Sequence, residues 1–387
     1  MLAVEDHGSM QAEHLIEAAV AAAAVDEVVD DGFRPGLDAL LDSFDREAAP
    51  NELGEPTLEA LVTGNLTTRL QVDQWWSQHP ELAGEIVDSP IFIVGVSRSG
   101  TTALSHLLSV DPAVRAPRQW EAQSPVPPPE AATYETDNRY LAAVEADENS
   151  VLDALNPAFK AMHHDPPDMP TECVTIIAGH MVSLQFNAMF NLPGYADFLL
   201  ATDHTATYRH HRRVLQLLQS RHPGRWVLKT PHHALAVDAI AEVYPDARFV
   251  WTHRDPATCI ASTASISYNL GSTFSDADHR LGAGELWTRL LGEMLDRLTD
   301  ARTRHADRFI DVDYGDLVRD PIGTARSIYA ATGQPLSDAT EARMRAHVDA
   351  HVQHRYGRHE YTFEDFGLDR AVLDARHAGY RAAYGLD

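Results

Sequence analysis

A glycine loop carries the most specific chemical signal in the chain. The apolar run 91–94 leads into Gly-Val-Ser-Arg-Ser-Gly-Thr-Thr over 95–102, and helical sequence follows. The two glycines have the G-x-x-x-x-G spacing of a phosphate cradle, in which backbone N–H groups and a helix N-terminus bind an anion. An ATPase or GTPase needs a lysine directly after the second glycine, where this chain has Thr101. The cation of the loop is Arg98, so the loop predicts a phosphate-bearing donor other than an ordinary nucleoside triphosphate.

A second pair of residues follows a later apolar run. Residues 248–252 are predicted as a strand, Arg254 comes just after its end, and Ser262 follows on a predicted helix. In an open α/β sheet, ligands bind beyond the carboxyl ends of the strands, so Arg254 is expected at the same edge as the glycine loop. Because an arginine beside a hydroxyl suits a phosphate, this pair predicts a clamp for a second, separate phosphate.

Two further segments begin where predicted strands end. Lys-Thr-Pro-His-His over 229–233 follows the apolar run 225–228, and Asp-Tyr-Gly-Asp-Leu over 313–317 follows the run 308–312. Both are expected at the edge that holds the glycine loop. The four segments therefore predict one site at the carboxyl edge of a parallel sheet.

In this order and spacing, the four segments resemble the sulfotransferases that use 3′-phosphoadenosine 5′-phosphosulfate (PAPS) as donor. The resemblance covers about 90–360 and points to a bacterial branch with arginine where the cytosolic enzymes have lysine in the loop. It implies that Arg254 and Ser262 hold the 3′-phosphate and that Tyr314 lies near the adenine. It also implies that the loop residues bind the 5′-phosphosulfate, namely Arg98, Ser99, Gly100, Thr101 and Thr102.

The resemblance also implies catalytic roles. Lys-Thr-Pro-His over 229–232 is similar to the Lys-Thr-His segment of cytosolic sulfotransferases with one inserted proline, so Lys229 is expected to neutralise the sulfuryl oxygens and His232 to act as general base. Glu121 is the competing base, because tyrosylprotein sulfotransferases use a glutamate from a comparable place. Near the C-terminus, Arg358 resembles the basic glycine segment that folds over the donor, although the Gly-x-x-Gly-x-x-Lys pattern of cytosolic members is absent.

The order of strand-like and helical sequence predicts the architecture. Helical sequence separates the apolar runs, which is typical of a parallel sheet with helices on both faces, here an α/β fold of P-loop type. Before the sheet, residues 1–89 are predicted as a helical accessory region, and residues 90–387 as the sulfotransferase domain. The helices predicted in the accessory region cover 11–29, 37–48 and 58–78.

Within the catalytic domain, residues 125–220 are predicted as a helical insertion over the active site. The segment begins with the proline-rich run 125–129. It contains side chains that suit an apolar acceptor pocket, with ordinary helical core as the alternative. These side chains are Met162, Phe186, Met189, Phe190, Tyr195 and Phe198.

Composition excludes several classes of function. The 31 basic and 57 acidic residues give a net charge of −26, which argues against nucleic acid and anionic membranes as partners.

The histidines at 163–164 and 210–211 lack the i, i+4 spacing of a metal-binding helix, so no metal site is predicted. The apolar stretch 18–24 is too short to span a membrane and follows no basic leader, so a cytoplasmic protein is expected.

Together these features predict a sulfotransferase. The expected reaction moves the sulfuryl group of PAPS in line to a hydroxyl of a small, partly apolar acceptor, with a general base and no metal, and leaves 3′-phosphoadenosine 5′-phosphate (PAP) as product. The alternatives are a P-loop kinase for a small molecule and a non-catalytic nucleotide-binding protein. The sequence leaves the acceptor and the oligomeric state open, a homo-oligomer included.

Overall fold

A parallel β-sheet forms the centre of the molecule. The computed structural model describes residues 10–162, 166–351 and 361–386. Within these residues the sheet has five strands, all parallel, in the order β2-β3-β1-β4-β5. The strands are β1 (Ile91–Val94), β2 (Val114–Arg115), β3 (Arg225–Lys229), β4 (Arg248–His253) and β5 (Phe309–Asp313). The strand that leads into the glycine loop therefore lies between the strands that lead to Lys229 and Arg254.

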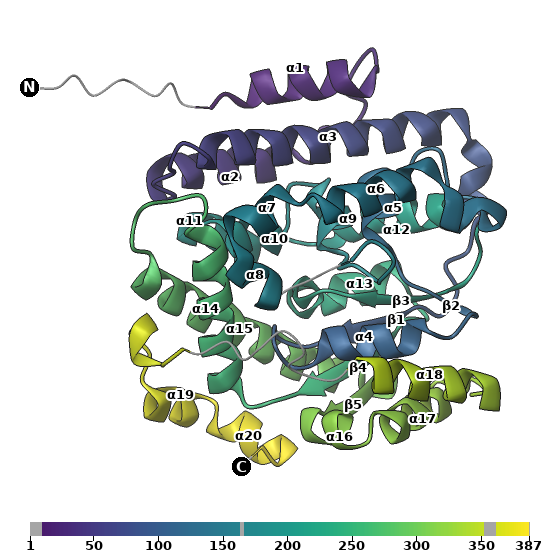
Figure 1. The fold of residues 1–387 in the computed structure, drawn as a ribbon, viewed down its shortest axis with the longest axis vertical. Helices are drawn as coiled ribbons and strands as arrows, with labels where there is room; N and C mark the ends of the chain where they lie inside the picture. Colours follow the sequence, from purple (N-terminus) through teal and green to yellow (C-terminus); the bar gives the residue numbers. More distant parts are fainter. Residues whose placement is uncertain (1–9, 163–165, 352–360, 387) are drawn as a thin grey trace, which may run out of the picture.

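Helices cover both faces of this sheet (Figure 1). They are α4 (Thr101–Ser109), α12 (Thr205–Gln219), α13 (Val237–Val243), α15 (Arg280–Arg304), α17 (Pro321–Ala331) and α18 (Asp338–Ala350). Ile91 and Ile93 of β1 belong to the core shared with α4, α17 and α18, and Phe92 and Val94 belong to the core shared with α12, α13 and α15. This alternation follows from the period of two in a strand. The predicted α/β fold with a parallel sheet is confirmed.

The N-terminal helices stack along one side of the molecule (Figure 1). They are α1 (Ala12–Ala23), α2 (Arg34–Glu47) and α3 (Gly54–Gln78), followed by the 3₁₀ helix η1 (Pro80–Gly84). The first helix is shorter than predicted, because Ala24 adopts a left-handed conformation with a φ of 54°. The buried guanidinium of Arg69 joins α3 to Asp30 and His180 at 2.6 and 2.7 Å. The domain boundary at residue 89 stays a prediction.

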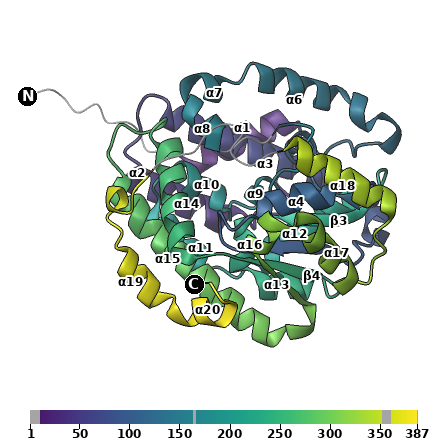
Figure 2. The ribbon, with the colours of Figure 1, turned by 60° about the horizontal axis from the view of Figure 1, so that its bottom comes forward.

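Short helices dominate the segment predicted as an insertion. They are α6 (Asn138–Glu148), α7 (Val151–Leu155), α8 (Pro157–Met162), α9 (Val174–Ala178), α10 (Leu184–Met189) and α11 (Pro193–Ala201), after α5 (Gln119–Gln123) and the 3₁₀ helix η2 (Ala131–Thr136). Figure 2 shows α6 and α7 at the outer edge of the molecule. Among the helices that the structure describes, none combines the length and the apolar character that a bilayer span requires.

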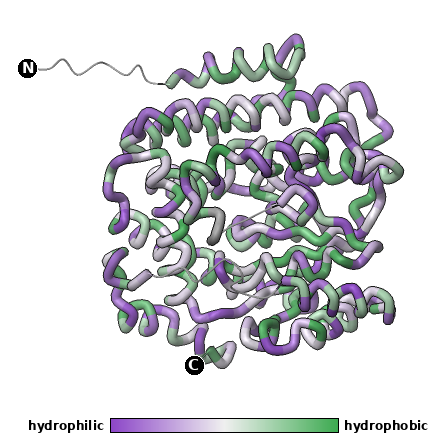
Figure 3. Tube along the Cα trace, viewed as in Figure 1, coloured by the Kyte–Doolittle hydropathy of each residue, from purple (hydrophilic) through white to green (hydrophobic). Residues whose placement is uncertain are grey.

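The remaining elements complete the edge of the sheet and the C-terminal region. They are η3 (Pro231–Leu235), α14 (Pro256–Gly271), η4 (Ala306–Arg308), α16 (Tyr314–Arg319), η5 (Glu364–Phe366), α19 (Arg370–Arg376) and α20 (Ala378–Tyr384). Figure 3 shows apolar and hydrophilic residues alternating along the outer helices. α8 packs against α14, which places the segment 125–220 beside the carboxyl edge of the sheet.

Candidate active site

The glycine loop is tightly curled between β1 and α4. Gly95 and Gly100 have φ angles of 146° and 92°, which side-chain-bearing residues rarely adopt. A Cβ at Gly95 would lie 2.6 Å from the Thr252 hydroxyl, and a Cβ at Gly100 would lie 2.8 Å from the Tyr314 ring. Arg98 has a φ of 70°, a strained conformation of the kind that concentrates at ligand sites. Close packing therefore fixes the loop that holds Arg98.

Ser99 stabilises the loop from inside. Its side chain is fully buried, and its hydroxyl donates to the Val96 carbonyl at 2.7 Å and lies 2.7 Å from the Thr252 hydroxyl. Its backbone N–H also points to the Val96 carbonyl, at 3.3 Å. Ser99, which the sequence assigned to the donor, thus has both of its hydrogen-bond donors engaged within the protein.

Two arginines meet where the loop approaches β4 and α14. Arg98 Nε donates to the Ser262 hydroxyl at 3.3 Å, and Arg254 donates to the Arg98 carbonyl at 2.6 Å. The Arg254 guanidinium also lies 4.2 Å from the centre of the Tyr314 ring. Burial, followed by the charge of Arg254, lowers the pKa of Arg98 below its ordinary value. The fold thus brings together all four of these predicted residues.

These arginines lack the acidic partners that most other arginines have. Among the described residues, neither Arg98 nor Arg254 forms an ion pair with a carboxylate. Two neighbouring cations without a counter-charge repel one another, and an anionic ligand between them removes that cost. The N-terminus of α4, which begins at Thr101, adds its partial positive charge to the same place.

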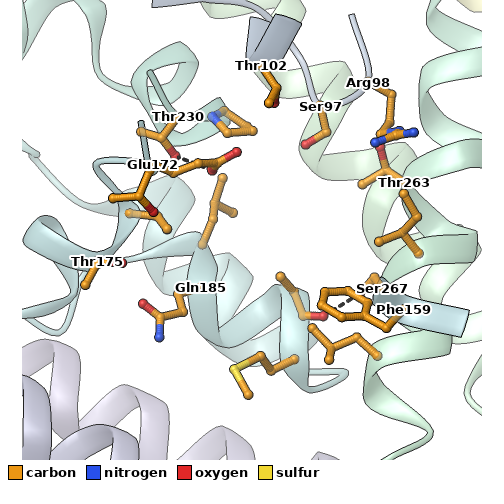
Figure 4. Close-up of a pocket in the computed structure, with 18 of the residues that line it drawn as sticks. Ser97, Arg98, Thr102, Phe159, Glu172, Thr175, Gln185, Thr230, Thr263 and Ser267 are labelled. Atoms are coloured by element: carbon orange, nitrogen blue, oxygen red, sulfur yellow. Dashed lines mark hydrogen bonds between the residues drawn. The ribbon is translucent and has the colours of Figure 1, made fainter. Parts of the chain in front are cut away.

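Lys229 ends β3 and reaches the first turn of α4. Its ammonium group donates to the Thr102 hydroxyl at 3.1 Å and to Glu172 at 2.8 Å, and the residue is 1% exposed. The second oxygen of Glu172 accepts from the Thr230 hydroxyl at 3.2 Å. Figure 4 shows the Glu172 carboxylate projecting into the cavity between Thr102 and Thr230. The Glu172 carboxylate therefore lines the cavity while paired with an ammonium group that is itself buried.

Sequence reasoning missed Glu172. The residue lies in the segment 125–220, outside every motif, and no spacing relates it to Lys229. A single backbone contact brings the two together, because the N–H of Cys173 donates to the Lys229 carbonyl at 2.9 Å. Only the tertiary fold carries that signal.

His232 lies beside the cavity but turns away from it. The 3₁₀ turn of η3 exposes Thr230 and Pro231 to the cavity and buries the His232 ring completely. Its Nδ1 accepts from the backbone N–H of Leu184, and its Nε2 lies 3.3 Å from His204 Nδ1. Burial, followed by His204, lowers the pKa of His232 well below its ordinary value. In this conformation the ring does not reach an acceptor in the cavity.

Glu121 is also buried, with both carboxylate oxygens engaged. One oxygen pairs with the Arg115 guanidinium, and the other accepts from the backbone N–H of Arg118 at 3.1 Å as part of a capping box for α5. The side chain is fully buried and does not line the cavity. Its contacts are those of a structural carboxylate, because a buried charge is retained only when it is paired.

A cavity of about 440 Å³ joins the loop to the helices of the segment 125–220. Figure 4 shows Ser97, Arg98 and Thr102 along one edge, Glu172 and Thr230 along a second, and Thr263, Ser267 and Phe159 along a third. Its volume is in the range of small-molecule sites. We refer to this cavity as the chamber.

Of the apolar side chains named from the sequence, Met189 lines the chamber. Four others, Phe186, Phe190, Tyr195 and Phe198, pack in or against the main core. Arg358 and the histidines at 163–164 lie outside the described residues. Within the described ranges, no group of three or more metal-ligating side chains could hold an ion.

Known proteins with related sequences and folds are sulfotransferases. A model described as the sulfotransferase family matches residues 90–338. Over 317 residues the chain is 24% identical to the omega-hydroxy-beta-dihydromenaquinone-9 sulfotransferase Stf3 of Mycobacterium bovis, covering 78% of this chain and 76% of that protein.

Two mycobacterial crystal structures match nearly end to end. Sulfotransferase STF9 from Mycobacterium avium is 30% identical with a TM-score of 0.90, covering 100% of this chain and 99% of that one. Sulfotransferase STF1 from Mycobacterium tuberculosis is 32% identical with a TM-score of 0.86, covering 96% and 99%. With a family model matching well over half of the chain and two relatives of this identity, the protein belongs to the sulfotransferase family and is a transferase enzyme.

Proposed function

We propose that this enzyme transfers the sulfuryl group of PAPS to a hydroxyl group of a small acceptor and releases PAP. The acceptor oxygen forms a bond to sulfur as the bond from sulfur to the phosphate oxygen breaks, and the hydroxyl proton leaves to a protein base. The observation that carries the proposal is the meeting of Arg98 and Arg254 at one end of a chamber that is also lined by Glu172, the ion-pair partner of the buried Lys229.

The donor fits the cationic end of the chamber. Arg98, with the N-terminal N–H groups of α4 at Thr101 and Thr102, would hold the 5′-phosphosulfate. Arg254 and Ser262 would hold the 3′-phosphate. Ser262 contacts Arg98 and Arg254 contacts the Arg98 carbonyl, so these groups lie within hydrogen-bond distance of one another.

Three further residues are assigned to the donor from the sequence. Tyr314 would lie near the adenine, and its ring is already held by Arg254. The role assigned to Arg358 in covering the donor stays a prediction, because that residue lies outside the described part of the chain. Gly100 would let the backbone approach the donor, since a side chain there would collide with Tyr314.

Glu172 is the base that the geometry favours over His232 and Glu121. Its carboxylate lines the chamber, whereas the other two side chains are fully buried and engaged elsewhere. A general base must come within about 3 Å of the proton that it accepts, and such help contributes roughly 10² to 10⁴ in rate. Substitution of each residue distinguishes the three candidates, since only Glu172 would contact the acceptor in this assignment.

Lys229 would stabilise the charge that develops during transfer. Its ammonium group lies between Thr102 and Glu172, at the junction of the donor loop and the proposed base. The ammonium group is buried, so its charge would act on the sulfuryl oxygens or the leaving phosphate oxygen across this junction, whereas Arg98, which lines the chamber, would contact them directly. Its partner Glu172 balances its charge until the anionic donor arrives.

The hydroxyl acceptor is inferred from the chemistry of the site and from a relative. By its name, Stf3 acts on an omega-hydroxy compound, and we infer a hydroxyl acceptor for this enzyme too. Glu172 suits such an acceptor, because a carboxylate can take the proton of an alcohol as its oxygen attacks. The cytoplasmic location stays a prediction from the sequence.

Calorimetry and product analysis test this function. We expect PAP and PAPS to bind well and ATP weakly, and we expect sulfated product in the presence of EDTA. A P-loop kinase would instead turn over ATP with strict Mg²⁺ dependence. A non-catalytic binding protein would bind PAP but yield no sulfated product with any alcohol in a broad panel.

A further inference from the structure

One wall of the chamber offers a ligand fewer hydrogen-bond donors than its residue types indicate. This wall, which we call the α14 wall, consists of Thr263, Ile266, Ser267 and Leu270. The Thr263 hydroxyl donates to the Cys259 carbonyl at 2.7 Å, one turn back along α14. With its hydroxyl proton engaged by the helix, Thr263 has no donor left for a polar acceptor.

Ser267 is engaged in the same way, across the gap to α10. Its hydroxyl donates to the carbonyls of Asn187 and Ala188 at 3.3 and 3.2 Å, and Figure 4 shows this bond at the chamber edge. The two hydroxylated residues of the α14 wall therefore donate to backbone carbonyls. The α14 wall offers a ligand carbon surface and no free hydrogen-bond donor.

The surfaces that face the α14 wall are mostly apolar. α10 contributes Leu184, Ala188 and Met189 together with one amide, that of Gln185. Phe159 and Trp287 extend the apolar surface on neighbouring helices. A polyhydroxylated ligand placed here would lose its water and recover few hydrogen bonds, because Gln185 is the one polar side chain of α10 that lines the chamber. Each polar group left unpaired carries a cost. An alkyl or terpenoid body, in contrast, gains from leaving water.

Charge also restricts the ligand. Apart from Arg98, no basic side chain of the described residues lines the chamber, whereas Asp147, Asp153 and Glu172 do. Arg98 stands at the loop and is assigned to the donor. Among the described residues that line the chamber, a carboxylate or phosphate on the far end of an acceptor would therefore meet Asp147 and no cation, in a protein whose net charge is −26.

We propose that the acceptor is an uncharged alcohol with one reacting hydroxyl on an extended apolar body, and that the α14 wall selects that body. The inference rests on the proposed function, since it places the reacting hydroxyl at Glu172. It excludes carbohydrates and alcohols that carry a carboxylate.

A chain-length series tests this class. With PAPS as donor, kcat/KM is measured for hexanol, octanol and decanol, and each added methylene is expected to raise it about fourfold until the chamber is filled. Methyl glucoside and 10-hydroxydecanoate are the polar and anionic comparators, each expected at least about tenfold below decanol. A flat series, or a comparator that exceeds decanol, overturns the inference.

A substitution in the α14 wall supplies the second test. Ile266→Asp places a carboxylate on the wall and is expected to flatten the chain-length series, whereas Ile266→Leu keeps it. PAP affinity, measured by calorimetry, is expected to stay within about threefold in both variants, because Ile266 is not one of the residues assigned to the donor. An unchanged series in Ile266→Asp contradicts the inference.

The two proposals fail in different ways. If PAP binds and a carbohydrate or a hydroxy acid is the best acceptor, the acceptor class is wrong and the sulfotransferase function stands. If neither PAP nor PAPS binds, the proposed function is wrong, and the acceptor class that rests on it fails as well.

Discussion

The hydroxyls of Ser99 and Thr252 lie 2.7 Å apart in the interior of the protein and join the glycine loop to β4. Two residues after Thr252, Arg254 returns to the same loop and donates to the Arg98 carbonyl at 2.6 Å. The glycine loop assigned to the 5′-phosphosulfate and the segment assigned to the 3′-phosphate are thus linked by two hydrogen bonds. A change at this junction is expected to affect the binding of both phosphates.

Thr252→Val removes one of the two links while keeping the shape of the side chain. Loss of a buried hydrogen bond is worth about 1 kcal/mol, so we expect PAP affinity to fall about fivefold. Calorimetry with PAP measures it, and Thr252→Ser, which keeps the hydroxyl, is the control. If Thr252→Val binds PAP as well as the unchanged enzyme does, the hydroxyl link does not position the loop.

Arg98→Ala is expected to abolish measurable transfer. The substitution removes the cation assigned to the phosphosulfate, and removal of a group that stabilises transition-state charge costs about 10² to 10³ in rate. Arg98→Lys is the matched control, since it keeps the charge without the planar fork and should retain part of the activity. Full activity in Arg98→Ala would show that Arg98 takes no part in the transfer.

Glu121→Gln separates a structural role from a catalytic one. The substitution leaves the buried Arg115 guanidinium without its carboxylate, so we expect the free energy of unfolding to fall by about 3 kcal/mol. The kcat of the folded enzyme should change little, since Glu121 does not line the chamber. Urea titration and steady-state kinetics measure the two effects. A large loss of kcat with unchanged stability would restore Glu121 as the base.

Buried histidines are expected to make the fold acid-sensitive. Burial lowers the pKa of His211 to about 3 and, with Arg297 next in effect, that of His204 to about 4. The unfolded chain has histidines with pKa values near 6.5, so below that pH it binds more protons than the folded state does. The stabilisation from these neutral rings is present above about pH 6.5 and is lost as the pH falls towards their folded-state pKa values.

Each such ring changes the free energy of unfolding by about 1.4 kcal/mol per pH unit in this window. Urea midpoints at pH 7.5, 6.5 and 5.5 measure the effect. We expect similar midpoints at the two higher values and a clear drop at pH 5.5. A midpoint that stays constant to pH 5.5 would mean that the rings are protonated in the folded enzyme.

Motifs that are continuous in the sequence could be predicted well. The loop 95–102 and the pair Arg254 and Ser262 were placed at one edge because parallel strands share their carboxyl ends. The strand β2, with two residues, carries no pattern that could identify it. The orientation of the His232 ring could not be predicted either, because it depends on the turn of η3 that buries the ring.

Glu172 shows the limit most clearly. Glu172 and Lys229 are 57 residues apart in the chain, and a backbone contact between Cys173 and Lys229 holds the two segments together. Glu172 lies within the segment 125–220, for which the sequence indicated apolar side chains and no carboxylate with a role at Lys229. Residues whose role depends on tertiary contacts alone cannot be found by spacing.

Transfer of labelled sulfate tests the central assignment most directly. The enzyme and its Glu172→Gln variant, in which the amide oxygen can still accept from Lys229, are mixed with PAPS labelled at sulfur and a panel of alcohols. We predict label in an alcohol with the unchanged enzyme, and PAP affinity within about threefold but transfer about 10² to 10⁴ lower in the variant. Full transfer by Glu172→Gln would contradict Glu172 as base, and no transfer to any alcohol by the unchanged enzyme would contradict the reaction itself.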